Sequence, residues 1–171
     1  HLLSAVGGGT INALRAARMR GTHPAGIISA RGGDGDGRQI AAAIEAAGID
    51  DRSAVFLDRR SASYTAILDE NGDVVPGLAD MEIYETALPR QLRRKALREA
   101  IASAKAVLVD ANLPVPGLEA AAGHATGPLF AIAISPAKVL RLTAIAGRID
   151  TVFMNRREMK ALTGQDHDVP G

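Results

Sequence analysis

The chain has 171 residues, of which 47% are hydrophobic and 23% charged, and its formal net charge is +1. This balance is typical of a soluble globular domain with a hydrophobic core, and it lacks the basic excess that binding to nucleic acid requires. Cysteine is absent, which excludes disulfides and thiolate chemistry and fits a reducing cytoplasm, and the longest apolar run, residues 129–134, is far too short to cross a bilayer.

The first fifty residues predict two helices, each ended by a glycine, with a short buried strand and a glycine-dense loop between them. In chain order these are the helix 11–20 with Gly21, the strand 25–30, the loop 31–37, and the helix 38–47 with Gly48. Together the last three form a strand–loop–helix unit.

Residues 54–78 predict a small antiparallel sheet. The segments 55–57 and 63–68 are rich in β-formers, and the segment 69–73 contains Asn-Gly, the strongest short hairpin signal. We interpret residues 54–78 as an excursion from the main domain, which comprises the remaining residues, 1–53 and 79–171.

The rest of the chain alternates between helices and short aliphatic strands. The predicted elements are the helix 89–104, the strand 106–110, the helix 116–123, the strand 129–134, the helix 136–146, the strand 151–154 and the helix 156–162. Such alternation predicts an α/β fold with a doubly wound, mostly parallel sheet.

Four polar or glycine-rich loops are candidates for a site. They are Gly7–Asn12, Gly32–Gly37, Asp110–Asn112 and Asn155–Glu158. Ligands of open α/β sheets bind outside the carboxyl ends of the strands, so we expect these loops to gather at one edge.

The loop at Gly7 has two interpretations. Three glycines allow close approach of a ligand to the backbone, and Asn12 offers both a donor and an acceptor. Alternatively the segment is a plain turn with Asn12 as a helix cap, which the motif alone favours. A dinucleotide-binding fingerprint would require glycine at position 12.

Two further acidic loops also have local explanations. A structural role for Asp34 in a turn and a functional role explain its position equally well. An EF-hand calcium loop is excluded, because Gln39 stands where that loop requires glycine. Asn155 and Glu158, three residues apart, could hold water on magnesium or orient phosphates, although spacing alone favours a helix-capping pair.

Taken together, these motifs resemble the PfkB family of carbohydrate kinases, which has a ribokinase-like fold. The resemblance covers about residues 7–164. Its main elements are Gly7–Asn12, Gly32–Arg38 and Asn155–Glu158 with Leu162–Gly164. Residues 79–84 (ADMEIY) and 109–114 (VDANLP) are similar to stretches of the pseudouridine kinases within that family.

The resemblance implies ATP-dependent transfer of the γ-phosphate to a primary hydroxyl of a sugar or nucleoside, with Mg2+ and a monovalent cation such as K+ as further candidates. It places the antiparallel sheet as a lid that closes over the sugar and often pairs two subunits into a homodimer. The substrate-binding residues that the resemblance implies are Gly7, Gly8, Asn12, Tyr64 and Asn112. It also implies that Asn155 and Glu158 lie near the phosphates and magnesium, with Glu158 contacting the metal through water.

The sequence also departs from the family pattern. No strand precedes the glycines, Gly33 replaces the first aspartate of G-D-D, and Ile132 replaces an aspartate of the pseudouridine kinases. The G-A-G-D motif with its aspartate base is absent, so no catalytic residue is assigned and we expect these residues alone to be inactive. The chain is then either part of a longer kinase or a non-catalytic sugar- or nucleoside-binding module.

Overall fold

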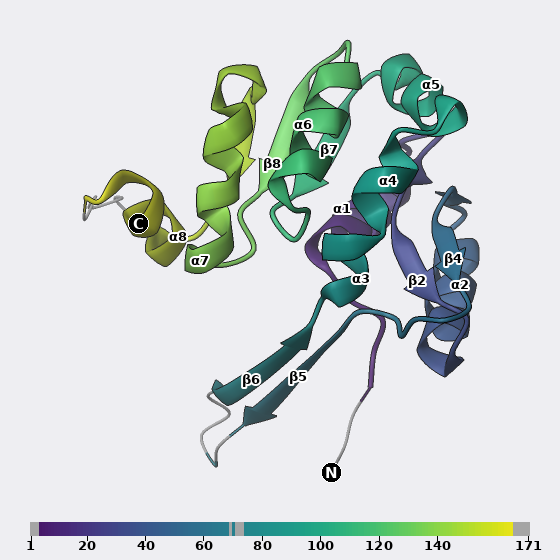
Figure 1. Cartoon of the computed structure of the whole chain (residues 1–171), viewed down its shortest axis with the longest axis horizontal. Helices are drawn as coiled ribbons and strands as arrows, with labels where there is room; N and C mark the ends of the chain where they lie inside the picture. The colour runs from purple at the N-terminus through teal and green to yellow at the C-terminus, as the bar shows by residue number, and fades with distance from the viewer. Residues whose placement is uncertain (1–3, 69, 71–73, 166–171) are drawn as a thin grey trace.

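The computed structural model of the chain describes residues 4–68, 70 and 74–165 (Figure 1). The strands are β1 (Gly26–Ile27), β2 (Ala30–Gly32), β3 (Asp50–Asp51), β4 (Ala54–Phe56), β5 (Ser63–Leu68), β6 (Val74–Asp80), β7 (Val107–Asp110), β8 (Leu129–Ile132) and β9 (Thr151–Phe153). The helices are α1 (Gly9–Met19), α2 (Gly35–Ala46), α3 (Glu82–Thr86), α4 (Leu88–Leu92), α5 (Lys95–Ser103), α6 (Val115–His124), α7 (Pro136–Val139), the 3₁₀ helix η1 (Leu140–Arg148) and α8 (Arg156–Thr163).

The strands outside the hairpin pair in parallel, as the sequence predicts. Strands β7, β8 and β9 form one sheet in that order, with Val107 opposite Leu129 and Phe130 opposite Thr151. Strand β1 pairs with β3, and β2 pairs with β4. The prediction of an α/β fold with a mostly parallel sheet is therefore confirmed.

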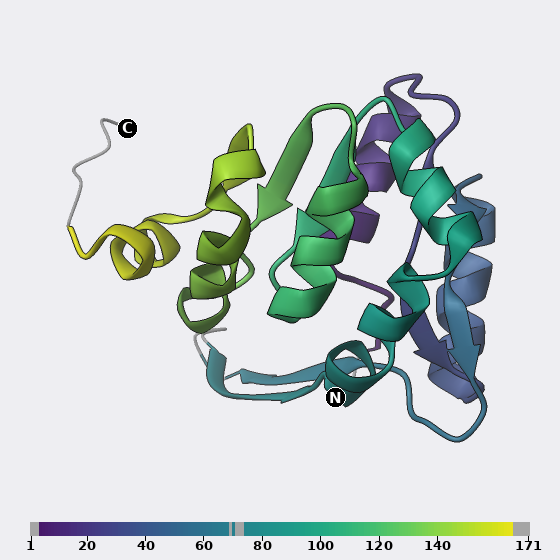
Figure 2. The same ribbon diagram turned by 45° about the horizontal axis from the view of Figure 1, so that its top comes forward.

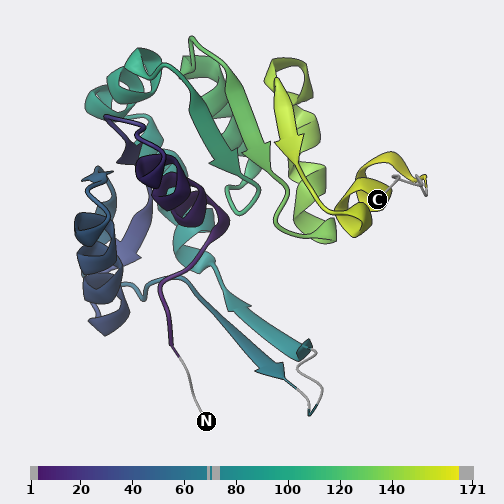
Figure 3. The same ribbon diagram turned by 180° about the vertical axis from the view of Figure 1, so that it is seen from behind.

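The largest apolar core surrounds strands β7 to β9. Buried aliphatic side chains from the strands meet those of α6, α7 and η1, and they include Leu118, Leu129, Ala131, Val139 and Leu142. Helix α6 covers the face of the sheet seen in Figure 1, whereas α1 lies on the opposite face, seen from behind in Figure 3. Helices on both faces of a parallel sheet are the arrangement of doubly wound folds. None of the helices that the structure describes has the length and apolar character needed to cross a membrane.

Strands β5 and β6 form an antiparallel hairpin that projects from the rest of the molecule in Figure 1 and runs along its lower edge in the turned view of Figure 2. Antiparallel pairing begins at Ser63, opposite Asp80. The sequence prediction started this excursion at residue 54, but β4 pairs in parallel with β2 and so belongs with the main strands. The predicted Asn-Gly turn lies outside the described residues.

Three predicted elements differ from those observed. The predicted strand 25–30 is two strands, β1 and β2, because its partner is interrupted between β3 and β4. The predicted helix 89–104 is α4 followed by α5, with extended backbone at Arg94, and both pieces pack on α6. The predicted helix 136–146 continues from α7 as the 3₁₀ helix η1.

Candidate functional site

The carboxyl ends of β7, β8 and β9 lie at one edge of their sheet, because the three strands are parallel. The loop Asp110–Asn112 follows β7, and Asn155 follows β9. Helix α1 begins at the same edge, since a Cβ added at Gly9 would lie 3.2 Å from Cδ1 of Ile132. The structure therefore brings three of the four predicted loops to a common edge.

Asp110 is a carboxylate held in a largely buried position at this edge. Its Oδ2 accepts a hydrogen bond from the Thr10 hydroxyl at 3.1 Å, and its Oδ1 accepts one from the backbone N–H of Asn112 at 2.8 Å. Burial raises the pKa of Asp110 above its ordinary value, although these hydrogen bonds and the charge of Lys138 act in the opposite direction. Thr10 and Asp110 thus join the start of α1 to the end of β7.

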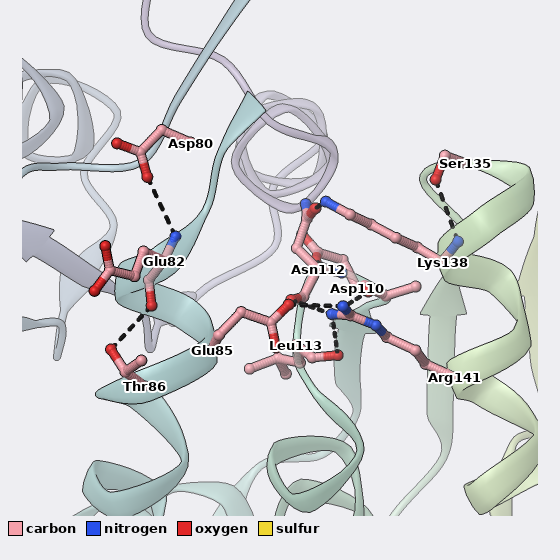
Figure 4. Close-up of polar contacts among 11 residues, drawn as sticks. Asp80, Glu82, Glu85, Thr86, Asp110, Asn112, Leu113, Ser135, Lys138 and Arg141 are labelled. Carbon is pink, nitrogen blue, oxygen red and sulfur yellow. Dashed lines mark hydrogen bonds and ion pairs between the residues drawn. The ribbon is translucent and has the colours of Figure 1, made fainter. Parts of the chain in front are cut away.

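Lys138, from α7, points toward the same loop (Figure 4). Its Nζ donates to the side-chain Oδ1 of Asn112. Burial lowers the pKa of Lys138, and the neighbouring charge of Arg141 lowers it further, whereas the carboxylates Asp110 and Glu85 raise it. The site therefore combines a partly desolvated ammonium group with a partly desolvated carboxylate.

Arg141 holds the loop after β7 in place. Its guanidinium Nη1 donates to the backbone carbonyls of Asn112 at 3.0 Å and Leu113 at 3.3 Å. Its Nη2 lies 2.6 Å from Oε1 of Glu85, which follows the hairpin in the chain (Figure 4). The planar fork of arginine suits such a multidentate role, so Arg141 fixes the backbone that carries Asn112.

Tyr84, on α3, adds a third perturbed group. Burial raises its pKa, and the negative charge of Asp110 adds to that shift, while a hydrogen bond with the Ser29 side chain opposes it. Perturbed titratable groups gather at functional sites, where burial and charge are used to tune them. Tyr84, Asp110 and Lys138 together therefore mark the edge as the candidate site.

The predicted substrate-binding residues occupy different positions around this cluster. Asn112 lies within it, and Gly7 and Gly8 lead into α1 beside it. Asn12 is exposed on α1, where its backbone N–H donates to the carbonyl of Gly8 at 3.1 Å. Tyr64 is 60% exposed on the hairpin. Its ring packs across Gly77, where an added Cβ would lie 2.4 Å from the tyrosine hydroxyl oxygen.

Asn155 and Glu158 form the capping pair that their spacing favours. The Asn155 Oδ1 accepts from the Glu158 backbone N–H at 2.9 Å, and Glu158 Oε2 accepts from the Asn155 N–H at 2.8 Å. Glu158 is only 6% exposed. Among the described residues no three histidine, cysteine, aspartate or glutamate side chains are placed to hold a metal ion.

The remaining predicted loop, Gly32–Gly37, contacts the segment before the hairpin and not the residues around Asp110. Asp34 caps α2 and accepts hydrogen bonds from Ser61, near the start of the hairpin, rather than from the Asp110 cluster. These bonds, led by the Ser61 hydroxyl, lower the pKa of Asp34 to about 2. Asp34 therefore lies at the base of the hairpin.

Sequence reasoning assigned no role to four contributors to the site, which are Thr10, Glu85, Lys138 and Arg141. Thr10 lies in the predicted loop Gly7–Asn12, directly before the predicted helix 11–20, and only the structure shows that it belongs to the first turn of α1. Lys138 and Arg141 are three residues apart after a strand, which places both on one side of the helical segment. Glu85 carried no signal, because only tertiary packing brings it to Arg141.

Comparisons with known proteins relate the chain to a family of kinases. A family model described as pfkB family carbohydrate kinase matches residues 2–170. The chain is 25% identical over 140 residues to a pseudouridine kinase from Escherichia coli, covering 81% of the chain and 44% of that protein.

Solved structures show the same fold. A carbohydrate kinase from Agrobacterium tumefaciens is 48% identical, with a TM-score of 0.83, over 92% of this chain and 52% of that one. An adenosine kinase from Anopheles gambiae is 17% identical, with a TM-score of 0.80 and the same coverage. The chain therefore spans about half the length of the relatives it matches.

Proposed function

Because the chain belongs to the pfkB family of carbohydrate kinases, we propose that it supplies the acceptor-binding part of an ATP-dependent kinase acting on a sugar or nucleoside. The reaction is transfer of the γ-phosphate of ATP to a primary hydroxyl, where a protein acts mainly by positioning and charge stabilisation. The observation that carries the proposal is the polar cluster of Asp110, Asn112 and Lys138 at the carboxyl edge of the sheet.

A polyol or nucleoside suits the chemistry of this cluster. Carboxylate, amide and ammonium groups supply acceptors and donors for hydroxyl and carbonyl groups, and such groups discriminate strongly when they are partly desolvated. Pseudouridine is our first candidate, supported by the match to the Escherichia coli enzyme and by the stretches 79–84 and 109–114. The proposed contacts are Gly7, Gly8, Asn12, Asn112 and, from the hairpin, Tyr64.

The cofactors proposed are ATP and Mg2+, with K+ as a further candidate. Since Asn155 and Glu158 hydrogen-bond to each other in the cap, we limit their role to orienting water and phosphates near the metal. A homodimer through the hairpin and a cytoplasmic location stay predictions from the sequence.

Calorimetry on the purified chain tests the acceptor site. We expect pseudouridine or a related nucleoside to bind more tightly than free ribose, and the Asn112→Ala substitution to weaken binding about tenfold through loss of a hydrogen-bonding side chain. Thr126→Ala is the matched control, because Thr126 lies before β8, at the other end of the strand, where its hydroxyl donates to the Ala102 carbonyl.

The same titrations separate the alternatives. Equal affinity of parent and Asn112→Ala for every nucleoside and sugar would reject the proposed acceptor site. Nucleoside binding with no ATP binding would favour the non-catalytic binding module. Turnover of ATP by the purified chain, well above background, would contradict the expectation that these residues alone are inactive.

A further inference from the structure

The start of the β5–β6 hairpin is tied to the loop between β2 and α2. The carboxylate of Asp34 accepts two hydrogen bonds from Ser61, one from its hydroxyl at 2.7 Å and one from its backbone N–H at 2.8 Å. Ser61 stands two residues before β5 and is only 3% exposed. Two hydrogen bonds from one residue to a charged carboxylate fix the position of that residue strongly.

Two glycines make this approach possible. The Ser61 hydroxyl also accepts from the backbone N–H of Gly32 at 2.9 Å. A Cβ at Gly32 would lie 2.4 Å from the carbonyl oxygen of Arg59, and one at Gly37 would lie 2.0 Å from that of Gly32. Neither position has room for a side chain, so the glycine-dense loop is shaped to receive the segment that leads into the hairpin.

The other end of the hairpin is held in a different way. Strand β6 ends at Asp80, whose Oδ1 accepts from the backbone N–H of Glu82 at 3.3 Å, and α3 follows. Ile83 of α3 is buried against Ala30 and Leu88. The second end is held by this packing together with polar contacts of α3, since Arg59 donates to the Thr86 hydroxyl at 2.7 Å and Glu85 pairs with Arg141. At the first end, the buried polar contact is the one between Asp34 and Ser61.

We propose that Asp34 is a positioning residue for the β5–β6 hairpin, acting through Ser61, with Gly32 and Gly37 providing the close approach. Two-stranded hairpins are marginally stable by themselves, so their orientation depends on how their ends are held. The anchoring stands on these contacts alone. Its consequence for closing the hairpin over a substrate rests on the proposed function.

Hydrogen exchange on the purified chain tests the anchor. In Asp34→Asn, the Oδ1 atom can still cap α2 and accept from the Ser61 hydroxyl, but an amide group replaces the oxygen that accepts from the Ser61 N–H. We expect amide exchange in residues 59–68 to become at least about tenfold faster, while α2 and β7 to β9 keep their rates.

Asp36→Asn is the matched control, because it removes the same charge from the first turn of α2 at an exposed position. It should exchange like the parent. Ser61→Ala removes the hydroxyl bond that Asp34→Asn leaves in place, so it should also speed exchange in the hairpin. The double variant lacks both bonds and should exceed either single change.

Three outcomes would overturn the proposal: unprotected exchange at Ser61 in the parent, no change in Asp34→Asn, or equal acceleration in the β7–β9 sheet. Each is read without any ligand, so it is independent of the nucleoside titrations. In a chain that binds nucleoside, Asp34→Asn should also weaken binding more than Asp36→Asn does.

Discussion

Asp34 and Asn155 are both helix N-caps, but their remaining hydrogen bonds differ. Each precedes a helix and accepts a hydrogen bond from the backbone N–H three residues later, Gly37 for α2 and Glu158 for α8. Asn155 finds both of its partners within that turn, because its backbone N–H donates to the carboxylate of Glu158. Asp34 uses its second oxygen to bind Ser61, 27 residues away.

The difference teaches that a cap acquires a tertiary role when its surroundings allow a second chain segment to come close. Beside Asp34, the glycines at 32 and 37 leave no space for a Cβ and admit the Ser61 segment. Beside Asn155 the partner side chain comes from the same helix, and the pair is locally complete. Four substitutions, one control variant and one pH titration test how far this contrast extends.

The largest effect is expected for Gly37→Ala. The new Cβ would lie 2.0 Å from a backbone carbonyl oxygen, which cannot rotate away, so the Asp34 region must distort. We expect a loss of about 3 kcal/mol or more in the free energy of unfolding, measured by urea denaturation.

Gly123→Ala is the control for this change, because nothing lies within 4 Å of its Cβ position in α6. It should stabilise the chain by about 0.5 kcal/mol through the better helix propensity of alanine. Equal stability of the two variants would show that the close approach at Gly37 is not needed.

Next in size is the comparison of Asp34→Ala with Asn155→Ala. The asparagine variant loses a helix cap, which costs about 1 kcal/mol in unfolding free energy. The aspartate variant loses a cap and leaves the partly buried Ser61 donors without their acceptor, so about 2–3 kcal/mol is expected. Denaturation curves that give equal losses would mean that Asp34 acts only on α2.

A pH titration of stability should distinguish the two caps further. Hydrogen bonds lower the pKa of Asp34 from 3.8 to about 2, so its contribution is complete above pH 3.8 and is lost as the pH falls toward 2. Asp34→Asn should remove that part of the slope. Asn155 does not titrate, so Asn155→Ala should keep the parent's slope between pH 4 and 2.

The smallest change in stability is expected for Glu158→Gln. Glutamine also serves in a capping box, so the free energy of unfolding should fall by no more than about 0.5 kcal/mol. If Glu158 acts near phosphates, the same variant should bind ATP and magnesium more weakly at nearly unchanged stability. Calorimetry with unchanged ATP affinity would assign Glu158 to the cap alone.

The sequence predicted the architecture well, because the aliphatic runs at β7, β8 and β9 are separated by helices with clear glycine or proline limits. It failed where tertiary packing decided the local structure. Extended backbone at Arg94 divides one predicted helix so that both halves pack on α6. Strand β4 was placed in the hairpin because β-forming residues do not reveal their pairing partner.

The candidate site was only partly predictable for the same reason. Asp110 and Asn112 follow a recognisable strand, so their location at the sheet edge could be inferred. The partners that fix them come from residues far away in sequence, Lys138 and Arg141 on one side and Thr10 on the other. No local pattern indicated that Asp34 would bond to Ser61 instead of joining this group.

The bond between Thr10 and Asp110 spans 100 residues of chain. During synthesis on the ribosome, the capping turn at Asp34 needs only its immediate neighbours, the first residues of α2. The candidate site at the sheet edge, in contrast, can form only after β7 has been translated and the long loop has closed, which is a slow, non-local step. Nascent chains halted before Asp110 can therefore contain such local turns but not the candidate site.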